Sequence, residues 1–295
     1  MRIFVTGATG FIGLAVVKEL ISFGHSVLGL TRSEEGRGLL LGMGADAHHG
    51  SLEDIDSLRR GAEDSDAVIH LAFIHDFSKF SENCQKDKAA IEAMGEVLAG
   101  SGKPFIVTAG AGGLAGAGIT ATEEFEIPSD SKLPRVSEQT AMALISKGVS
   151  SAVVRLPQVH NTVKQGFVSY LIALARQKGV AAYVDNGSNR WSAGHISDVA
   201  RLYRLALEKH ETGARYHAVG EEGVSMLEIA ENIGRGLKIP VVSMTGEEAK
   251  GYFGWMYNFV SNDMLASSIL TQKKLGWVPS GTGMIEDLKN MNYTV

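Results

Sequence analysis

The feature that most constrains this chain is a run of three glycines near its N-terminus. Gly7, Gly10 and Gly13 recur at three-residue spacing between an apolar segment, 3–6, and an amphipathic segment, 11–23. Glycine there lets backbone N–H groups approach a pyrophosphate, and the start of the following helix favours a bound anion. The pattern predicts a strand-to-helix turn that binds the phosphates of a dinucleotide. The alternative is that the glycines only shape a tight turn.

Short apolar runs alternate with helix-length amphipathic segments through the first half of the chain, which is typical of a parallel sheet covered by helices. The apolar runs predict strands at 3–6, 27–30, 45–48, 67–71, 105–108 and 152–156. The amphipathic segments predict helices at 11–23, 52–60, 82–98 and 137–147, with Ser51 as the N-cap of the second. The predicted fold class is therefore α/β, a Rossmann doubly wound parallel sheet.

The pattern changes after residue 156. Helices are expected at 168–177, 199–208, 226–236 and 247–255 and in the last residues, with strands at 181–184 and 215–219. We expect residues 1–158 to form an NAD(P)-binding domain and residues 195–220 to return to it. Residues 159–194 and 221–295 are expected to form a smaller C-terminal substrate-binding lobe.

The residues after the second predicted strand indicate which nicotinamide dinucleotide is bound. Proteins that bind NAD commonly place Asp or Glu there, where the carboxylate accepts a hydrogen bond from the ribose 2′-hydroxyl. This chain has Arg32 and Ser33 instead, with Arg37 close by, and these groups suit a 2′-phosphate. The segment favours NADP, with NAD as the weaker expectation. The alternative is that Arg32 is an ordinary solvated cation.

Composition excludes several other classes of protein. The net charge of -5 argues against a nucleic-acid partner, because phosphate binding needs a concentrated basic surface. The one cysteine, Cys84, cannot form an intramolecular disulfide, and no apolar run reaches the roughly 20 residues that span a bilayer. The histidines and carboxylates form no recognisable metal set. We expect a cytoplasmic protein with a small-molecule substrate, no membrane and no metal, for which a homodimer is compatible with the composition.

Four segments resemble the NAD-dependent epimerase/dehydratase family of extended or atypical short-chain dehydrogenases/reductases. The run VTGATGFIG at 5–13 is similar to the family's glycine motif, and 66–72 resembles its fourth strand. Segment 154–160 resembles the run after the sixth strand, and 195–200 resembles the return to the nucleotide domain. The resemblance covers nearly the whole chain and implies a Rossmann fold that binds a nicotinamide cofactor.

The glycine motif, the basic segment and the resemblance together indicate the cofactor contacts. The resemblance places Ser51 and Leu52 near the adenine, 71–73 along the ribose and pyrophosphate, and Pro157 and Val159 near the nicotinamide. The full expected set is Gly7, Thr9, Gly10, Phe11, Ile12, Gly13, Arg32, Ser33, Ser51, Leu52, Leu71, Ala72, Phe73, Thr108, Arg135, Pro157 and Val159.

The chain departs from the family in its catalytic residues. Short-chain dehydrogenases use a Ser with a Tyr-x-x-x-Lys pair, in which the Tyr transfers the proton. No tyrosine precedes Tyr170, and the positions of the pair fall near Asp130 or Ser131 and near Pro134 or Arg135. Loss of a general acid removes about 10²–10⁴-fold from reductions that need a proton. Hydride transfer to a well-placed acceptor is still allowed.

Three residues are candidates for the missing roles. Arg135 could hold the ribose, although a guanidinium is a poor acid. His160 could donate a proton from beyond the sixth strand, and Thr108 could anchor a substrate oxygen. The alternatives are a surface cation, a structural histidine and an ordinary strand residue, respectively.

The function we expect is that of an NADP-dependent oxidoreductase that reduces a small or medium apolar carbonyl, imine or enone. Segments 110–118, 163–170 and 252–259 are rich in glycine and aromatic residues, which indicates an apolar pocket between the two parts. Tyr183 and Trp191 either line this pocket or only pack beside it. Two other functions stay open: a non-catalytic NADP-binding sensor, and an epimerase- or dehydratase-like isomerase or lyase that keeps its cofactor bound.

Overall fold

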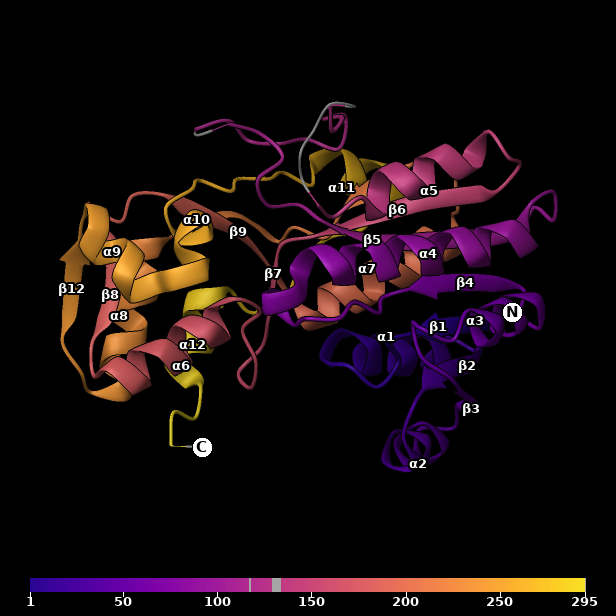
Figure 1. Cartoon of the computed structure of the whole chain (residues 1–295), viewed down its shortest axis with the longest axis horizontal. Helices are drawn as coiled ribbons and strands as arrows, with labels where there is room; N and C mark the ends of the chain where they lie inside the picture. Colours follow the sequence, from indigo (N-terminus) through magenta and orange to yellow (C-terminus); the bar gives the residue numbers. More distant parts are fainter. Residues whose placement is uncertain (117, 129–133, 295) are drawn as a thin grey trace.

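The computed structural model describes residues 1–116, 118–128 and 134–294, and its largest element is a seven-stranded parallel sheet (Figure 1). The strand order is β10-β6-β5-β4-β1-β2-β3, which contains the 3-2-1-4-5-6 order of doubly wound folds. The predicted Rossmann fold class is therefore confirmed. The strands are β1 (Arg2–Thr6), β2 (Ser26–Thr31), β3 (Asp46–His49), β4 (Ala67–His70), β5 (Pro104–Gly110), β6 (Ser150–Leu156) and β10 (Arg215–His217).

Helices cover both faces of this sheet, and each face has its own apolar core. One layer contains α1 (Phe11–Ser22), α2 (Glu34–Gly42) and α7 (Ile196–Glu208). The other contains α3 (Ile55–Glu63), α4 (Phe80–Leu98) and α5 (Ser137–Ile145). Because both faces are covered, the central strands are mostly apolar, as in Ile3, Phe4 and Val5 of β1, which are 0 % exposed.

A second, smaller part lies beyond the carboxyl ends of the strands and has a separate apolar core (Figure 1). Its strands are β7 (Gln158–His160), β9 (Arg190–His195) and β11 (Glu221–Ser225) in one sheet, and β8 (Ala181–Val184) with β12 (Val241–Met244) in another. Its helices are α6 (Val168–Lys178), α8 (Met226–Leu237), α9 (Gly246–Phe253), α10 (Tyr257–Val260) and α12 (Met284–Asn290). We call this part the lobe.

Three short helices complete the chain. They are the 3₁₀ turns η1 (Phe77–Lys79) and η2 (Gly254–Met256), and α11 (Ile269–Leu275), which packs against β10. None of the helices in the described ranges is both long enough and apolar enough to cross a bilayer.

The structure corrects the expected N-cap of the second predicted helix. Ser51 does not cap it, because α3 begins at Ile55 and the Asp54 carboxylate accepts from Ser57 N at 3.0 Å. The Ser51 hydroxyl oxygen instead accepts from Glu53 N at 3.2 Å. Aspartate and serine cap helices about equally well, so the local sequence did not distinguish them.

Helix α2 was not expected, because its sequence EEGRGLLLG contains three glycines, which are poor helix formers. Two tertiary features compensate for this low helix propensity. Ser33 caps the helix by accepting from Gly36 N at 3.1 Å, and Leu40 is 0 % exposed in the core beside the sheet. Packing therefore overrides a weak local propensity.

Candidate functional site

The glycine turn joins β1 to α1 at the point where the strand order reverses, with β4 on one side of β1 and β2 on the other. Gly7 has φ +68°, and a Cβ there would lie 2.8 Å from Ala72 N. A Cβ at Gly13 would lie 2.0 Å from the Gly7 carbonyl oxygen. Only glycine fits these two positions, so the turn brings β1, β4 and α1 into close contact.

The start of α1 is suited to an anion. Gly10 is its N-cap, with no side-chain capping bond from the described residues, so the amides of the first turn are available to phosphate oxygens. Phe11, Ile12 and Thr9 are half-buried around this turn. A dinucleotide pyrophosphate fits the bare backbone of this site, and its binding here is the arrangement that doubly wound sheets favour.

The end of β2 presents the predicted basic segment. Arg32 is exposed there, and it takes part in none of the hydrogen bonds or ion pairs found between described side chains. The Ser33 hydroxyl is engaged as the cap of α2, and Arg37 forms an exposed ion pair with Glu34 at 3.3 Å. Of the three, Arg32 keeps its full hydrogen-bonding capacity for a ligand.

The other expected cofactor contacts lie at the same edge of the sheet. The segment with Ser51 and Leu52 follows β3, and Leu52 is buried at 8 % exposure. Leu71, Ala72 and Phe73 follow β4 directly and are half-buried.

Pro157 and Val159 come after β6, where the chain enters the lobe. Val159 is 4 % exposed and pairs with Gly194 between β7 and β9. Because this side chain is buried in the sheet-side core, Pro157 is the more accessible of the two.

Arg135 is held in place by a chain of buried hydrogen bonds that begins at the end of β1. Thr6 Oγ1 lies 2.8 Å from His70 Nδ1, and His70 Nε2 lies 3.1 Å from Asp87 Oδ1. Ser137 Oγ donates to Asp87 Oδ2 at 2.6 Å, and Arg135 Nε donates to Ser137 Oγ at 3.1 Å. Thr6, His70, Asp87 and Ser137 are each at most 1 % exposed. The chain links the strand before the glycine turn to Arg135.

The same residues also fix the charge of the Asp87 carboxylate. Thr6 Oγ1 accepts from Ala72 N at 3.2 Å as well as contacting His70 Nδ1. His70 Nε2 and Ser137 Oγ both contact the Asp87 carboxylate. Burial alone would raise the pKa of Asp87, but the hydrogen bond and charge of His70, the charge of Arg135 and the hydrogen bond from Ser137 lower it. Asp87 is therefore the buried counter-ion of Arg135.

The Arg135 guanidinium lies at the carboxyl edge of β4 and β5. Its Nη2 donates to the Thr108 carbonyl oxygen at 3.3 Å, and its central carbon lies 4.3 Å from the centre of the Phe73 ring. A permanent cation at this edge can bind ribose or substrate oxygens and can polarise a carbonyl, but it does not donate a proton.

The Thr108 hydroxyl points away from this edge. Its Oγ1 lies 2.7 Å from the Tyr203 hydroxyl on α7, and both groups are buried. Burial raises the pKa of Tyr203 far above its ordinary value, despite the hydrogen bond to Thr108. The hydroxyl pair joins β5 to α7, and the part of Thr108 that contributes to the candidate site is its carbonyl oxygen.

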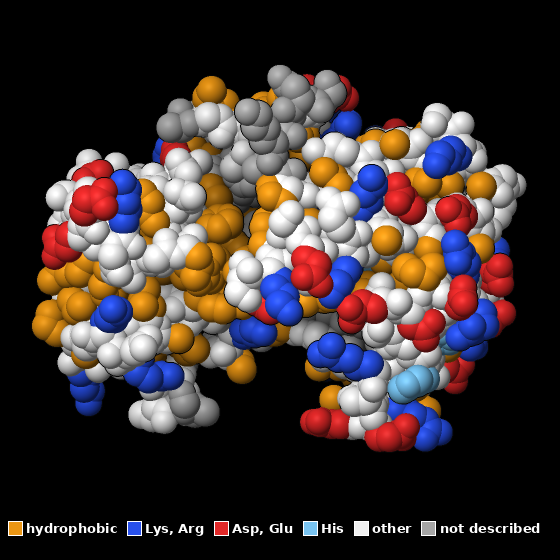
Figure 2. Space-filling view, viewed as in Figure 1, with side chains coloured by type: hydrophobic (Ala, Val, Ile, Leu, Met, Phe, Trp, Pro, Cys, Tyr) orange, Lys and Arg blue, Asp and Glu red, His pale blue; other side chains and the backbone are white. Residues whose placement is uncertain are grey.

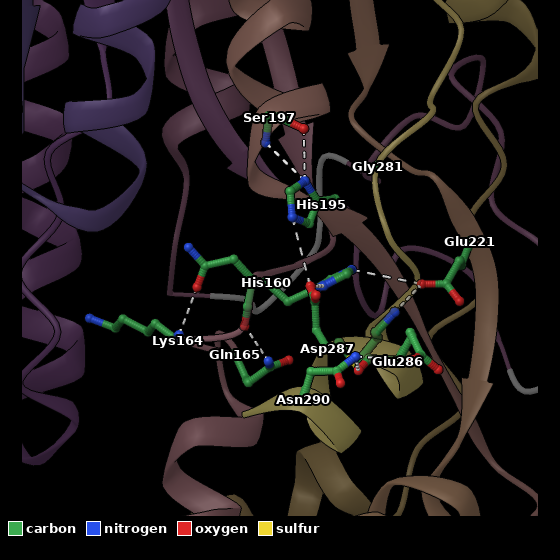
Figure 3. A network of polar contacts seen from close by, with 12 residues as sticks. His160, Lys164, Gln165, His195, Ser197, Glu221, Gly281, Glu286, Asp287 and Asn290 are labelled. Atoms are coloured by element: carbon green, nitrogen blue, oxygen red, sulfur yellow. Dashed lines mark hydrogen bonds and ion pairs between the residues drawn. The ribbon is translucent and has the colours of Figure 1, made fainter. Parts of the chain in front are cut away.

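His160 lies in a different cluster, which it forms with His195, Glu221 and Asp287 (Figure 3). The ring is 0 % exposed; its Nδ1 lies 2.7 Å from Asp287 Oδ2 and its Nε2 lies 3.7 Å from Glu221 Oε2. His195 Nε2 is 3.8 Å from the same Asp287 oxygen. Burial lowers the pKa of His160, although Asp287 and Glu221 oppose that change. His160 is therefore hydrogen-bonded to Asp287 through Nδ1, whereas its Nε2 has no hydrogen-bond partner among the described residues.

Tyr183 and Trp191 differ in position. Trp191 is 0 % exposed, and its Nε1 donates to the Phe259 carbonyl oxygen at 3.1 Å. Tyr183 lies on β8, far along the lobe (Figure 1). Trp191 therefore supports the lobe from inside.

Aromatic side chains from both parts of the chain meet where the lobe faces the sheet. Phe77 of η1 stacks on Trp255 of η2, with ring centroids 4.3 Å apart and an interplanar angle of 13°. Phe77 also contacts Phe167 and Tyr170 edge to face, at 5.6 and 5.9 Å. Figure 2 shows a hollow between the lobe and the sheet part with hydrophobic side chains along it. We call Phe77, Phe167, Tyr170 and Trp255 the aromatic wall.

One residue of this edge was considered from the sequence only as a metal ligand. His75 is exposed, and its ring lies edge to face with Phe73 at 5.3 Å and Phe77 at 6.2 Å. The described residues contain no group of three or more side chains that could hold a metal ion. The signal that could have identified His75 is its position, two residues after the expected cofactor segment 71–73.

Comparisons with known proteins agree with this geometry. Residues 3–98 match the model of the NAD dependent epimerase/dehydratase family. The chain is 46% identical to "uncharacterized protein C2A9.02" of Schizosaccharomyces pombe over 294 residues, which cover 99% of this chain and 100% of that protein. It belongs to the epimerase/dehydratase family, and is thus an NAD-binding enzyme of the short-chain dehydrogenase/reductase type.

Two more distant proteins are also similar to this chain. A sterol-4-alpha-carboxylate 3-dehydrogenase, decarboxylating, of Dictyostelium discoideum is 28% identical over 239 residues, covering 76% of this chain and 72% of that protein. The structure of Thermus thermophilus UDP-glucose 4-epimerase in complex with NAD superimposes with a TM-score of 0.75 at 18% identity, and covers 99% of both chains. The second likeness concerns the fold alone.

Proposed function

We propose that this protein is an NADPH-dependent reductase of small or medium apolar carbonyl, imine or enone compounds. The observation that carries the proposal is the position of Arg135 at the edge of the sheet, where Ser137 links its guanidinium to the buried Asp87 carboxylate. Bound NADPH would supply the hydride. Arg135 would bind and polarise the acceptor oxygen, and the aromatic wall would exclude water and contact the apolar part of the substrate.

The preference for NADPH rests on Arg32. Its guanidinium is exposed at the end of β2, where a 2′-phosphate would lie, and the segment offers no carboxylate between β2 and α2 for a 2′-hydroxyl. A charge-assisted hydrogen bond to phosphate is worth about 1.5–3 kcal/mol, or roughly 10–100-fold in affinity.

The cofactor test compares two charge reversals that change the net charge equally. Arg32→Glu is expected to weaken NADPH binding by about 10–100-fold and to leave NADH binding unchanged or tighter. Arg60→Glu, on the exposed side of α3, should change the affinity for neither cofactor. Fluorescence titration measures the dissociation constants of both variants for NADPH and NADH. Equal losses of NADPH and NADH affinity in Arg32→Glu would contradict the preference.

The reaction test follows NADPH consumption on a panel of apolar aldehydes, ketones, imines and enones. Arg135→Gln is expected to lower kcat/KM by about 10–100-fold, since it removes a charged hydrogen bond to the acceptor oxygen. Tight NADPH binding without turnover on any substrate would instead identify a sensor. Cofactor that stays bound through purification and is never consumed would identify an isomerase or lyase.

A further inference from the structure

We propose that His75 is the proton donor of this site, in the role that the missing tyrosine has in the family; this inference rests on the proposed reductase function. The carboxyl end of β4 leads into segment 71–75, so His75 and the expected cofactor contacts Leu71, Ala72 and Phe73 come from one short stretch. This stretch lies where the strand order reverses, the place at which doubly wound sheets bind their ligands.

Phe73 connects His75 to Arg135. The guanidinium lies over the Phe73 ring at 4.3 Å, and the imidazole contacts the same ring edge to face at 5.3 Å. One aromatic ring therefore contacts both an electrophilic cation and a titratable group, and the charge of that cation acts on His75. We infer that a carbonyl oxygen bound by the guanidinium lies within reach of the imidazole.

Three other polar groups have partners elsewhere in the described part of the chain. The Tyr203 and Thr108 hydroxyls are paired with each other in the core at 2.7 Å. His160 is 0 % exposed and lies 2.7 Å from Asp287 inside the lobe. His75, in contrast, is exposed, so it can exchange protons with water after each turnover.

The charges that face His75 are cations. Partial burial lowers the pKa of His75, the charges of Arg135 and Lys164 lower it further, and a hydrogen bond with the Phe73 backbone opposes them. The neighbouring Asp76 carboxylate is turned toward Ser78, whose backbone N donates to it at 3.0 Å. A lowered pKa makes the imidazolium a stronger acid than an ordinary histidine, which favours transfer of its proton to a developing alkoxide.

The step is a balanced reduction. The carbonyl carbon receives the hydride that NADPH supplies, with oxidation of the cofactor to NADP⁺. As the oxygen becomes negative, a ring N–H bond of the His75 imidazolium breaks and an O–H bond forms, which gives the alcohol. The neutral imidazole then regains a proton from water. Because the acid form of His75 is required, kcat/KM for reduction should fall as pH rises above the His75 pKa, whereas alcohol oxidation should rise over the same range.

The first experiment compares two conservative variants with the wild type at saturating NADPH. His75→Gln is expected to lower kcat/KM for an aldehyde by about 10²–10⁴-fold and to remove the fall at higher pH. His210→Gln is the matched control, because burial also lowers the pKa of His210 but it bonds Ser150 at the amino end of β6. NADPH affinity and melting temperature should be unchanged in both variants.

The second experiment does not depend on turnover. Imidazole NMR should give His75 a pKa below its ordinary value of 6.5. Lys164→Met removes one of the cations that face it, so the pKa should rise, and the inflection of the kcat/KM profile should move upward with it. If His75 had only a structural role, a change in its pKa would not move the inflection of the kcat/KM profile.

The outcomes separate this inference from the proposed function. If the wild type reduces carbonyls and His75→Gln keeps both its rate and its pH profile, His75 is not the donor, while the reductase function stands. If Lys164→Met moves the NMR pKa and leaves the kinetic inflection in place, another group donates the proton. If the wild type binds NADPH and reduces nothing on the panel, both proposals are overturned.

Discussion

His75 and His160 both lie beyond the carboxyl ends of the main sheet, yet their surroundings are opposite. His160 is 0 % exposed, with carboxylates of Asp287 and Glu221 at 2.7 and 3.7 Å. His75 is exposed, with aromatic rings and cations as neighbours. A buried imidazole bonded to a buried carboxylate contributes to stability, whereas an exposed imidazole that borders cations can offer a hydrogen bond to a substrate.

The largest effect should be a loss of stability when His160 is replaced. His160→Ala leaves the Asp287 carboxylate buried without its hydrogen bond, which costs about 3–5 kcal/mol. His75→Ala changes an exposed side chain and should cost about 0.5 kcal/mol or less. Urea unfolding of both variants measures the difference. Equal losses of unfolding free energy would end the contrast between the two histidines.

The next effect concerns binding at the glycine turn. Gly7→Ala places a Cβ 2.8 Å from Ala72 N at a positive φ, so the turn must shift. Strain of about 1–3 kcal/mol should weaken NADPH binding by roughly 10–100-fold. Gly38→Ala in α2, where a Cβ meets open space, is the control and should bind normally. Unchanged affinity in Gly7→Ala would place the phosphates elsewhere.

A smaller effect is the pH dependence of stability from His160. Burial lowers its folded-state pKa below 6.5, so the unfolded chain binds the proton more tightly. The contribution of neutral His160 to the free energy of unfolding is complete above pH 6.5. It is lost as the pH falls toward the folded-state pKa, and the unfolding free energy changes by at most about 1.4 kcal/mol per pH unit. The unfolding free energy of the wild type should therefore decline over this window more steeply than that of His160→Gln. Parallel curves would contradict the burial argument.

The smallest effect should come from the aromatic wall. Trp255→Leu removes the ring that stacks on Phe77, and such pairs are worth about 0.5–1.5 kcal/mol. In this variant, kcat/KM should fall more for a planar aromatic aldehyde than for an aldehyde of equal size with a saturated ring. Tyr183→Leu, on β8, is the control. An equal loss for both aldehydes would mean that the wall is only packing.

Much of the fold could be predicted because its signals are local. The glycine spacing and the apolar run 3–6 indicate the first strand, the turn and α1 without any tertiary information. Helix α2 and the cap of α3 were missed for the opposite reason: the first depends on Leu40 packing on the sheet, and the second on a choice between two equivalent caps.

The candidate site was less predictable, because the roles of its polar residues depend on what they face. Arg135, Thr108 and His160 were all plausible from their distance to a strand end. The structure leaves only Arg135 with its side chain at the edge, since Thr108 is paired with Tyr203 and His160 with Asp287. No periodicity could reveal those partners, which lie 95 and 127 residues away in sequence.

The sequence by itself determined the parallel sheet and the glycine turn between β1 and α1, because each is a property of residues that are close together in the chain. Only the tertiary structure decided which polar groups still have a hydrogen bond to offer. Burial and pairing are set by segments far apart in sequence, and the chemistry of Arg135 and His75 follows from what those segments leave exposed.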